Sequence, residues 1–260
     1  MDFRNGKELL DLCREHNLLI SDVMRQREIT CGSMTNEQID ARLKEILTIM
    51  KNAAHTPLET PTRSIGGLIG GEAKKTYEFS QTDNNLCGSF LSRAISYSMA
   101  VLEVNATMGL IVAAPTAGSA GVLPGVLLAL QEDRNLSDEA ICSAIVHASA
   151  IGYILMRNAS VSGAEAGCQA EVGAASAMAA SAVVEVMGGT PEMSLHAASI
   201  ALSNLLGMVC DPIAGLVEAP CQSRNSIGAA NAIPWAQLAL AGVTHPIPFD
   251  EMAEAMYRVG

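Results

Sequence analysis

The sequence predicts a mainly α protein that folds as one helical domain. Hydrophobic residues make up 49% of the 260 residues, which is enough to build one large core. Aromatic residues account for only 3%, so Ala, Gly, Met, Leu, Ile and Val must fill the interior, and such small side chains let helices pack closely. No convincing run of alternating polar and apolar residues argues for a sheet.

The first 60 residues predict a charged helical lead-in. Thr35 followed by Gln38 is a capping box, the usual signature of a helix start. Apolar residues then recur at helical spacing and form one stripe: Ile39, Leu43, Ile46, Leu47 and Met50. Residues 56–72 are rich in Pro and Gly and predict a surface loop.

The remaining residues, 76–260, predict the core of the domain. All five lysines lie at or before Lys75, so the character of the chain changes there. Helix starts are indicated by Ser137 before two acidic residues and by Thr190 before Pro191. The predicted helices cover residues 87–107, 121–133, 138–157, 169–187, 192–209, 225–241 and 249–258.

Charge and hydropathy exclude several classes of protein. The formal net charge is -11, and such an acidic chain repels phosphate backbones, so we expect no nucleic acid partner. The stretch from Val104 to Gln131 has no charged residue and exceeds the about 20 residues that span a bilayer. It contains Pro115 and Pro124 with several glycines, which is turn chemistry, so we expect buried helices and no membrane. The N-terminus is polar and shows no secretory signal, which favours the reducing cytoplasm.

Three of the seven cysteines have unusual flanks. Cys168 follows a Gly-rich stretch just before a predicted helix, where free N–H groups and the helix dipole would favour its thiolate. Cys210 ends a predicted helix before Asp-Pro, and Cys221 follows Pro220 on a predicted loop. Most buried cysteines are only small hydrophobes, and packing is our interpretation of Cys13 and Cys142; Cys31 and Cys87 are left undecided, with packing the favoured reading. For the first three, the residues alone leave packing and metal binding both open.

The spacing of these cysteines does not match a zinc finger. It places 41 residues between Cys168 and Cys210 and 10 between Cys210 and Cys221. Three thiolates suffice to hold a cubane cluster whose fourth iron stays open.

The stretches NASVSGAEAGCQAEVG, GMVCDPIAGLVEAPCQSRN and NATMGLIVAAPTAGSAGVLPG closely resemble the α subunit of iron–sulfur L-serine dehydratases, as do LIGGEAKK and ELLDLCREHNLLISDVM. The likeness covers essentially the whole of 1–260, as one α-type catalytic domain. It implies a helical domain built around a [4Fe–4S] cluster held by Cys168, Cys210 and Cys221. It also implies an L-serine ammonia-lyase, with the open iron acting as a Lewis acid on the substrate hydroxyl.

Two departures from that family bear on the partner. Members usually continue some tens of residues beyond the point that matches Gly260. Single-chain members also carry a second domain with a Ser-Ser-His-Thr motif, of which Ala54-His55-Thr56 is only a faint echo. We therefore expect a two-subunit enzyme with a β partner.

The substrate L-serine needs hydrogen-bond donors for its carboxylate. The residues of the Gly-rich turn after Pro115 suit an anion-binding site but on their own favour a plain structural turn. The likeness of this segment to the family implies the anion-binding site. The other candidates precede or follow the cysteines, and the full predicted set is Thr116, Gly118, Ser119, Asn158, Ser160, Ser162 and Arg224. No general base is assigned: Glu165 and Glu171 flank Cys168, while His147 and His196 fall in predicted helices, where core histidines are commoner.

Other functions stay open at this stage. Pyridoxal chemistry needs a lysine, and the absence of lysine after Lys75 argues against it. A cysteine desulfidase on the same scaffold would use the same iron against a thiol. A non-catalytic cluster-binding subunit and a membrane transporter are the remaining alternatives.

Overall fold

The computed structural model describes all 260 residues and contains helices without strands. This confirms the predicted mainly α class and the single domain. Twelve α-helices and two short 3-10 turns follow in order: α1 (Gly6–His16), α2 (Ile20–Thr30), α3 (Asn36–Glu59), α4 (Glu72–Ser80), α5 (Gly88–Ala106), η1 (Ala117–Ser119), α6 (Val122–Arg134), α7 (Asp138–Asn158), α8 (Gly163–Ala166), α9 (Cys168–Val186), α10 (Pro191–Ser203), η2 (Ile213–Gly215), α11 (Cys221–Leu240) and α12 (Phe249–Val259).

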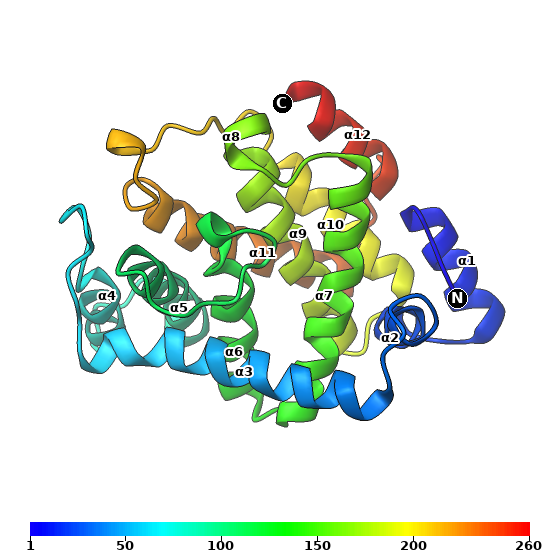
Figure 1. Ribbon diagram of the computed structural model, residues 1–260, viewed down its shortest axis with the longest axis horizontal. Helices are drawn as coiled ribbons and strands as arrows, with labels where there is room; N and C mark the ends of the chain where they lie inside the picture. The colour runs from blue at the N-terminus through cyan, green and yellow to red at the C-terminus, as the bar shows by residue number, and fades with distance from the viewer.

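Helix α9 forms the centre of the core. Every residue of α9 is buried except Glu171, Glu185 and Val186, because α6, α7, α10 and α11 all pack against it. Figure 1 shows α7, α9 and α10 side by side in the middle of the molecule, with α3 running along its lower edge. The Ala- and Gly-rich sequence of α9 lets the neighbouring helices surround α9 on all sides.

Glycine permits an especially close approach between α5 and α6. A side chain at Gly121 would collide with the Ser98 carbonyl oxygen, and one at Gly125 would lie 2.7 Å from the Ala94 carbonyl oxygen. The expectation that small residues bring helices together is therefore met at this contact.

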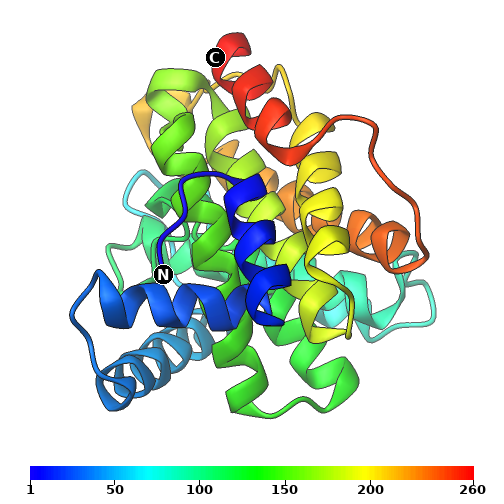
Figure 2. The ribbon, with the colours of Figure 1, turned by 90° about the vertical axis from the view of Figure 1, so that its right-hand side faces the viewer.

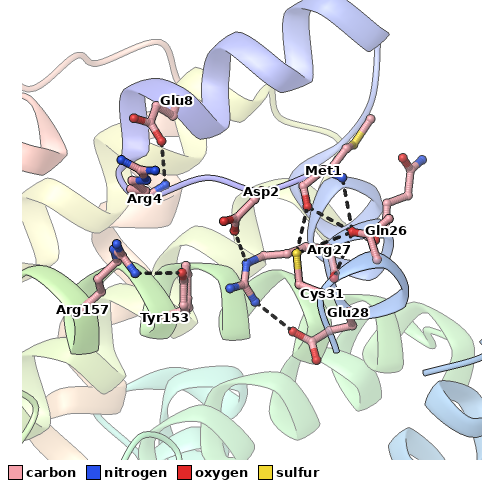
Figure 3. Close-up of polar contacts among 11 residues, drawn as sticks. Met1, Asp2, Arg4, Glu8, Gln26, Arg27, Glu28, Cys31, Tyr153 and Arg157 are labelled. Carbon is pink, nitrogen blue, oxygen red and sulfur yellow. Dashed lines mark hydrogen bonds and ion pairs between the residues drawn. The ribbon is translucent and has the colours of Figure 1, made fainter. Parts of the chain in front are cut away.

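The N-terminal residues are fastened to the outer face of α7. Arg27 donates from Nε to Asp2 over 2.8 Å, and its guanidinium carbon lies 3.9 Å from the centre of the Tyr153 ring. Phe3 is fully buried and packs edge-on against the same ring. Figure 3 shows Arg27 reaching Asp2 and Glu28, with Tyr153 to one side of its guanidinium, and Figure 2 shows α1 and α2 on the same side of the molecule. These contacts combine an ion pair with cation–π attraction.

Most predicted helices are present, with the predicted caps. Thr35 with Gln38 forms the capping box of α3, and Ser137 and Thr190 cap α7 and α10. The predicted helix 192–209 is wrong at its end, since α10 stops at Ser203. The loop predicted for 56–72 begins only after Glu59, and α4 was not among the predicted helices.

One helix, α7, is long and apolar enough to cross a membrane by length and composition alone. Most of its apolar window is buried inside the protein, as is common for the core helix of a globular domain. The uncharged stretch 104–131 falls on the end of α5, η1 and α6, with turns between them.

Candidate active site

Cys168 is buried at the first position of α9. The preceding Gly167 has φ +79°, and a side chain there would lie 2.7 Å from the Met208 carbonyl oxygen. That carbonyl accepts a hydrogen bond from the Gln169 N–H over 2.9 Å, and Gln169 Oε1 accepts one from the Gly207 N–H over 2.8 Å. These contacts hold the chain that leads to Cys210 against the N-terminus of α9.

Cys221 and Cys210 exchange the places that the sequence predicted for them. Cys221 is buried as the first residue of α11 and does not lie on a loop. Cys210 is exposed in the connection between α10 and α11 and does not end a helix. The reason is that α10 stops at Ser203 while α11 begins four residues earlier than predicted. The three thiols thus comprise two at helix N-termini and one on a loop.

Arg224 joins the three segments that carry these cysteines. From the first turn of α11, its Nη1 donates to Cys168 Sγ over 3.1 Å and to the Val209 carbonyl over 2.7 Å. Its Nη2 forms an ion pair with Asp211. Arg224 is the only basic side chain that bonds to a cysteine in the structure. A predicted substrate ligand therefore lies at the cysteines.

Burial dominates the electrostatics of both helix-terminal cysteines. It raises the pKa of Cys168 to about 11, although the hydrogen bond and charge of Arg224 act in the opposite direction. Burial likewise raises the pKa of Cys221, and the charge of Glu171 adds to the effect. Desolvation therefore outweighs the charge of Arg224 at Cys168, and the predicted preference of the helix N-terminus for a thiolate does not show in this pKa. Metal binding must displace these protons.

The structure does not arrange the three cysteines as the ligands of a single metal ion. No group of three or more His, Cys, Asp or Glu side chains lies close enough to hold one metal ion. In a cubane each cysteine binds a different iron, so the ligands stand farther apart than around one ion. Burial is the largest cause of the raised pKa of Cys168 and of Cys221, and the charge of Cys210 is a further cause at both. Cys210 therefore lies near the other two thiols. Three thiols are a donor set that a cluster of several irons can use.

The predicted anion-binding turn forms η1 and is tied to α11. Asn225 is fully buried and donates from its amide to the Gly118 carbonyl over 2.7 Å and to the Cys221 carbonyl over 2.9 Å. Its Oδ1 accepts a hydrogen bond from the Gly121 N–H over 3.0 Å. Thr116 and Ser119 share a hydroxyl contact of 3.1 Å. Asn225 thus fixes the turn relative to Cys221, a role that sequence reasoning missed.

The remaining predicted ligands lie in different surroundings. Asn158 is exposed at the end of α7, where its amide donates to the Arg4 carbonyl over 2.6 Å, so it is not brought to the cysteines. Ser160 is buried and donates to Glu165 over 2.6 Å, and Ser162 occupies the N-cap position of the short helix α8 without a side-chain capping hydrogen bond. A role for each in binding substrate stays a prediction.

Glu218 is a buried carboxylate that sequence reasoning also missed. It accepts hydrogen bonds from Ser64 Oγ over 2.6 Å, the Gly66 N–H over 2.6 Å and the Leu68 N–H over 3.0 Å. Burial acts to raise its pKa, but these three donors prevail and lower it. Glu218 therefore fastens the loop 60–71 to the segment just before Cys221.

Glu103 makes a second link of this kind. It is buried on α5, and its Oε1 accepts hydrogen bonds from the Ala73 N–H and from Gln222 Nε2, both over 2.9 Å. Its other oxygen, Oε2, is buried without a hydrogen-bond partner. Burial raises the pKa of Glu103. The only signal for either carboxylate in the sequence is an acidic residue inside an apolar segment.

The histidines considered as bases belong to the packing of the core. His147 is fully buried, with Nδ1 2.8 Å from Glu185 and Nε2 2.7 Å from Ser181. His196 accepts a hydrogen bond from the His245 backbone N–H at 3.3 Å. Both ring nitrogens of His147 are thus in contact with structural neighbours, as expected of a core histidine.

A cavity of about 270 Å³ lies beside Cys210. One wall consists of α8 with Gly167, and the other of residues 207–210 with Val259 and Gly260. Cavities of about 480, 410 and 290 Å³ elsewhere in the fold are not lined by any of the three cysteines. Space for a small ligand is therefore present next to the exposed thiol.

The structure is an all-helical domain in which Arg224 bonds to the buried Cys168 and Asn225 ties a glycine-containing turn to Cys221. The family described as serine dehydratase alpha chain matches residues 15–260. The chain belongs to this family, which confirms the resemblance.

Several curated relatives are similar over the whole chain. The probable L-serine dehydratase alpha chain of Bacillus subtilis is 48% identical over 99% of this chain and 86% of its own length. The L-serine dehydratase alpha chain of Peptoniphilus asaccharolyticus is 44% identical over 98% of this chain and 87% of its own length. The L-serine dehydratase TdcG of Escherichia coli is 34% identical over 100% of this chain, but over only 58% of its own length.

Proposed function

We propose that this chain is the α subunit of an L-serine dehydratase, which converts L-serine into pyruvate and ammonia. The observation that carries the proposal is identity of 44–48% to proteins so named, over 98–99% of the chain. The reaction breaks the Cα–H and Cβ–O bonds and releases water. The resulting enamine tautomerises to an imine, and water hydrolyses that imine to pyruvate and ammonia.

We further propose that Cys168, Cys210 and Cys221 hold a [4Fe–4S] cluster. Their placement at two helix N-termini and on one adjacent loop supports the assignment. When bound, the cluster would supply a Lewis acid at the iron that no cysteine holds. Arg224 remains beside Cys168 to neutralise anionic charge.

The residues of the turn around η1 would orient the substrate. Thr116 and Ser119 bring two hydroxyls together, 3.1 Å apart, and Asn225 holds the turn in place. Lysine chemistry has less support, since Lys74 donates to the Glu59 carbonyl over 3.2 Å and no lysine follows Lys75.

A β partner completes the proposal. The chain matches only 58% of the single-chain relative from Escherichia coli, and the two relatives with the highest identities quoted above are themselves described as alpha chains. Large apolar side chains are exposed on loops beside the site: Ile65 at 72%, Met108 at 81% and Leu110 at 71%. The Ile65 N–H donates to the Ala106 carbonyl, so these loops adjoin. Apolar loops of this kind are typical of a surface that another chain covers.

A cytoplasmic location is likewise a proposal, supported by seven unpaired cysteines.

The test compares L-serine with L-cysteine on anaerobically reconstituted enzyme. We expect pyruvate and ammonia from L-serine at a kcat/KM well above that for L-cysteine, together with iron and sulfide bound in the protein. Sulfide release from L-cysteine as the preferred reaction would assign a desulfidase instead. A cluster without turnover of either amino acid, with the β partner present, would leave a cluster-binding subunit.

A further inference from the structure

Glu171 is a half-buried carboxylate at the meeting point of the predicted substrate segments. It lies one turn after Cys168 on α9, so both side chains point to the same side of that helix. Its Oε1 accepts a hydrogen bond from Thr116 Oγ1, and this is its only side-chain hydrogen bond. No Lys, Arg or His forms an ion pair with it. A carboxylate in the site therefore keeps most of its hydrogen-bonding capacity.

Two glycines make room for this one carboxylate. A Cβ at Gly118 would lie 2.5 Å from Glu171 Oε1, and a Cβ at Gly163 would lie 2.5 Å from Glu171 Oε2. At both positions the three nearest heavy atoms all belong to Glu171. Neither glycine has a positive φ, so the backbone does not require glycine there. The space exists for the carboxylate, which fixes its position between η1 and α8.

The chemistry of the substrate asks for such a group. An amino acid carries an ammonium as well as a carboxylate, and Arg224 with the hydroxyls of the turn suits only the carboxylate. The other acidic side chains of the site differ from Glu171: Glu165 is exposed, Asp211 is paired with Arg224, and Glu103 and Glu218 accept hydrogen bonds from backbone N–H groups. Glu171 is the half-buried acidic side chain without a basic partner, and its carboxylate has oxygen lone pairs left to accept hydrogen bonds from an ammonium.

We propose that Glu171 binds the α-ammonium group of the substrate and so selects amino acids over 3-hydroxy acids that lack it. This inference rests on the proposed function and names the specificity-determining residue of the same site. It predicts that charge at position 171 matters for ligands with an ammonium and not for ligands without one.

The experiment measures direct binding of two inert ligands to the anaerobic, reconstituted enzyme by titration calorimetry. L-alanine has the ammonium and carboxylate of serine without the hydroxyl, and propionate has the carboxylate alone. In Glu171→Gln we expect affinity for L-alanine to fall about tenfold to a hundredfold, as for loss of a hydrogen bond to a charged group. Affinity for propionate should change less than about threefold.

Two further variants keep the result interpretable. Glu171→Asp retains the charge and should retain the preference for L-alanine over propionate, even with weaker binding. Glu15→Gln, at an exposed position of α1, should match the unchanged enzyme. Circular dichroism and iron content show that each variant is folded and loaded.

Equal changes for both ligands, or none, would overturn the role of Glu171. So would unchanged binding of L-alanine together with lost turnover, which would assign Glu171 to proton transfer. Failure of the unchanged enzyme to form pyruvate from L-serine is a separate result, because it removes the proposed function and not the ligand preference.

Discussion

Asn225 offers the sharpest test of how the turn and the cysteines are coupled. Its buried amide bonds to Gly118, Gly121 and Cys221, so it is the single side chain that joins η1 to the first turn of α11. Replacement by alanine leaves the Gly118 carbonyl and the Gly121 N–H without their partner. The Cys221 carbonyl keeps the main-chain bond of the helix.

The expected loss follows from these two groups. A buried polar group without a partner costs about 1–3 kcal/mol, so two cost about 2–6 kcal/mol. Alanine recovers roughly 0.5–0.7 kcal/mol through its higher helix propensity. We therefore expect Asn225→Ala to lower the free energy of unfolding by about 1.3–5.5 kcal/mol. For a chain of this size that corresponds to a fall of about 3–22 °C in Tm.

Urea denaturation followed by circular dichroism measures this loss. Asn225→Asp should be at least as harmful, because a carboxylate oxygen would then face the carbonyls of Gly118 and Cys221 at 2.7 and 2.9 Å. The matched control is Asn52→Ala on the exposed face of α3, where propensity alone acts and no loss is expected. A loss below about 0.5 kcal/mol for Asn225→Ala, within the range of ordinary surface substitutions, would refute the proposed coupling.

Three further predictions concern the cysteines, Glu103 and the partner. Serine in place of any cluster cysteine should abolish iron content and turnover, whereas Cys13→Ser and Cys142→Ala should retain both; full iron in a variant of Cys168, Cys210 or Cys221 would contradict the assignment. Burial raises the pKa of Glu103, so the stability of the unchanged protein should decline as pH rises from the ordinary carboxyl pKa through the raised one. The expected decline in the unchanged protein is about 1.4 kcal/mol of unfolding free energy for each unit by which the pKa is raised. Glu103→Gln stays neutral and should show no such decline; parallel curves of unfolding free energy against pH for the two proteins would be inconsistent with this. Finally, the isolated chain should bind the cluster but turn over L-serine very slowly, and the β partner should raise kcat; a rate unaffected by that partner would place the base within this chain.

Local signals in the sequence predicted the helices well. The caps at Thr35, Ser137 and Thr190 are short-range hydrogen bonds between neighbouring residues, so they can be recognised without knowledge of the fold. The end of α10 could not be placed in the same way. Leu205 follows the helix and is still buried, so the apolar pattern continues through a turn, and Gly207 adopts a positive φ beyond it.

The exposure of cysteines shows a second limit of sequence reasoning. Cys13 is buried, as packing predicts, and Cys142 is half-buried. Cys31 and Cys87, for which the sequence favoured packing without deciding it, are exposed at a helix end and before a helix start. Flanking residues indicate a turn or a helix, but they do not show which side of that element another segment covers.

The long-range contacts of the site left almost no signal in the sequence. Glu218 contacts a loop about 150 residues away, and Asn225 contacts a turn more than 100 residues away. Neither contact has a periodicity or a motif of its own. Asn158 shows the converse, since proximity to Cys168 in sequence did not bring its side chain to the cysteines.

The acidic side chains around the site share one physical logic. Glu103 and Glu218 are buried without a basic partner and accept hydrogen bonds from backbone N–H groups of the segment 66–73. Glu103 anchors that segment to the chain beside Cys221 through Gln222. Glu218 does so directly, because it lies just before Cys221 in the chain. Backbone N–H groups carry only partial charge, so this scheme needs no lysine or arginine inside the site. The one arginine that bonds to a cysteine, Arg224, pairs with the anionic Asp211. Glu171 has no basic partner and, in our proposal, faces the ammonium of the substrate. In such a site the positive Arg224 and the negative Glu171 are two separate groups. An amino acid substrate likewise has a carboxylate and an ammonium as separate groups, one for each.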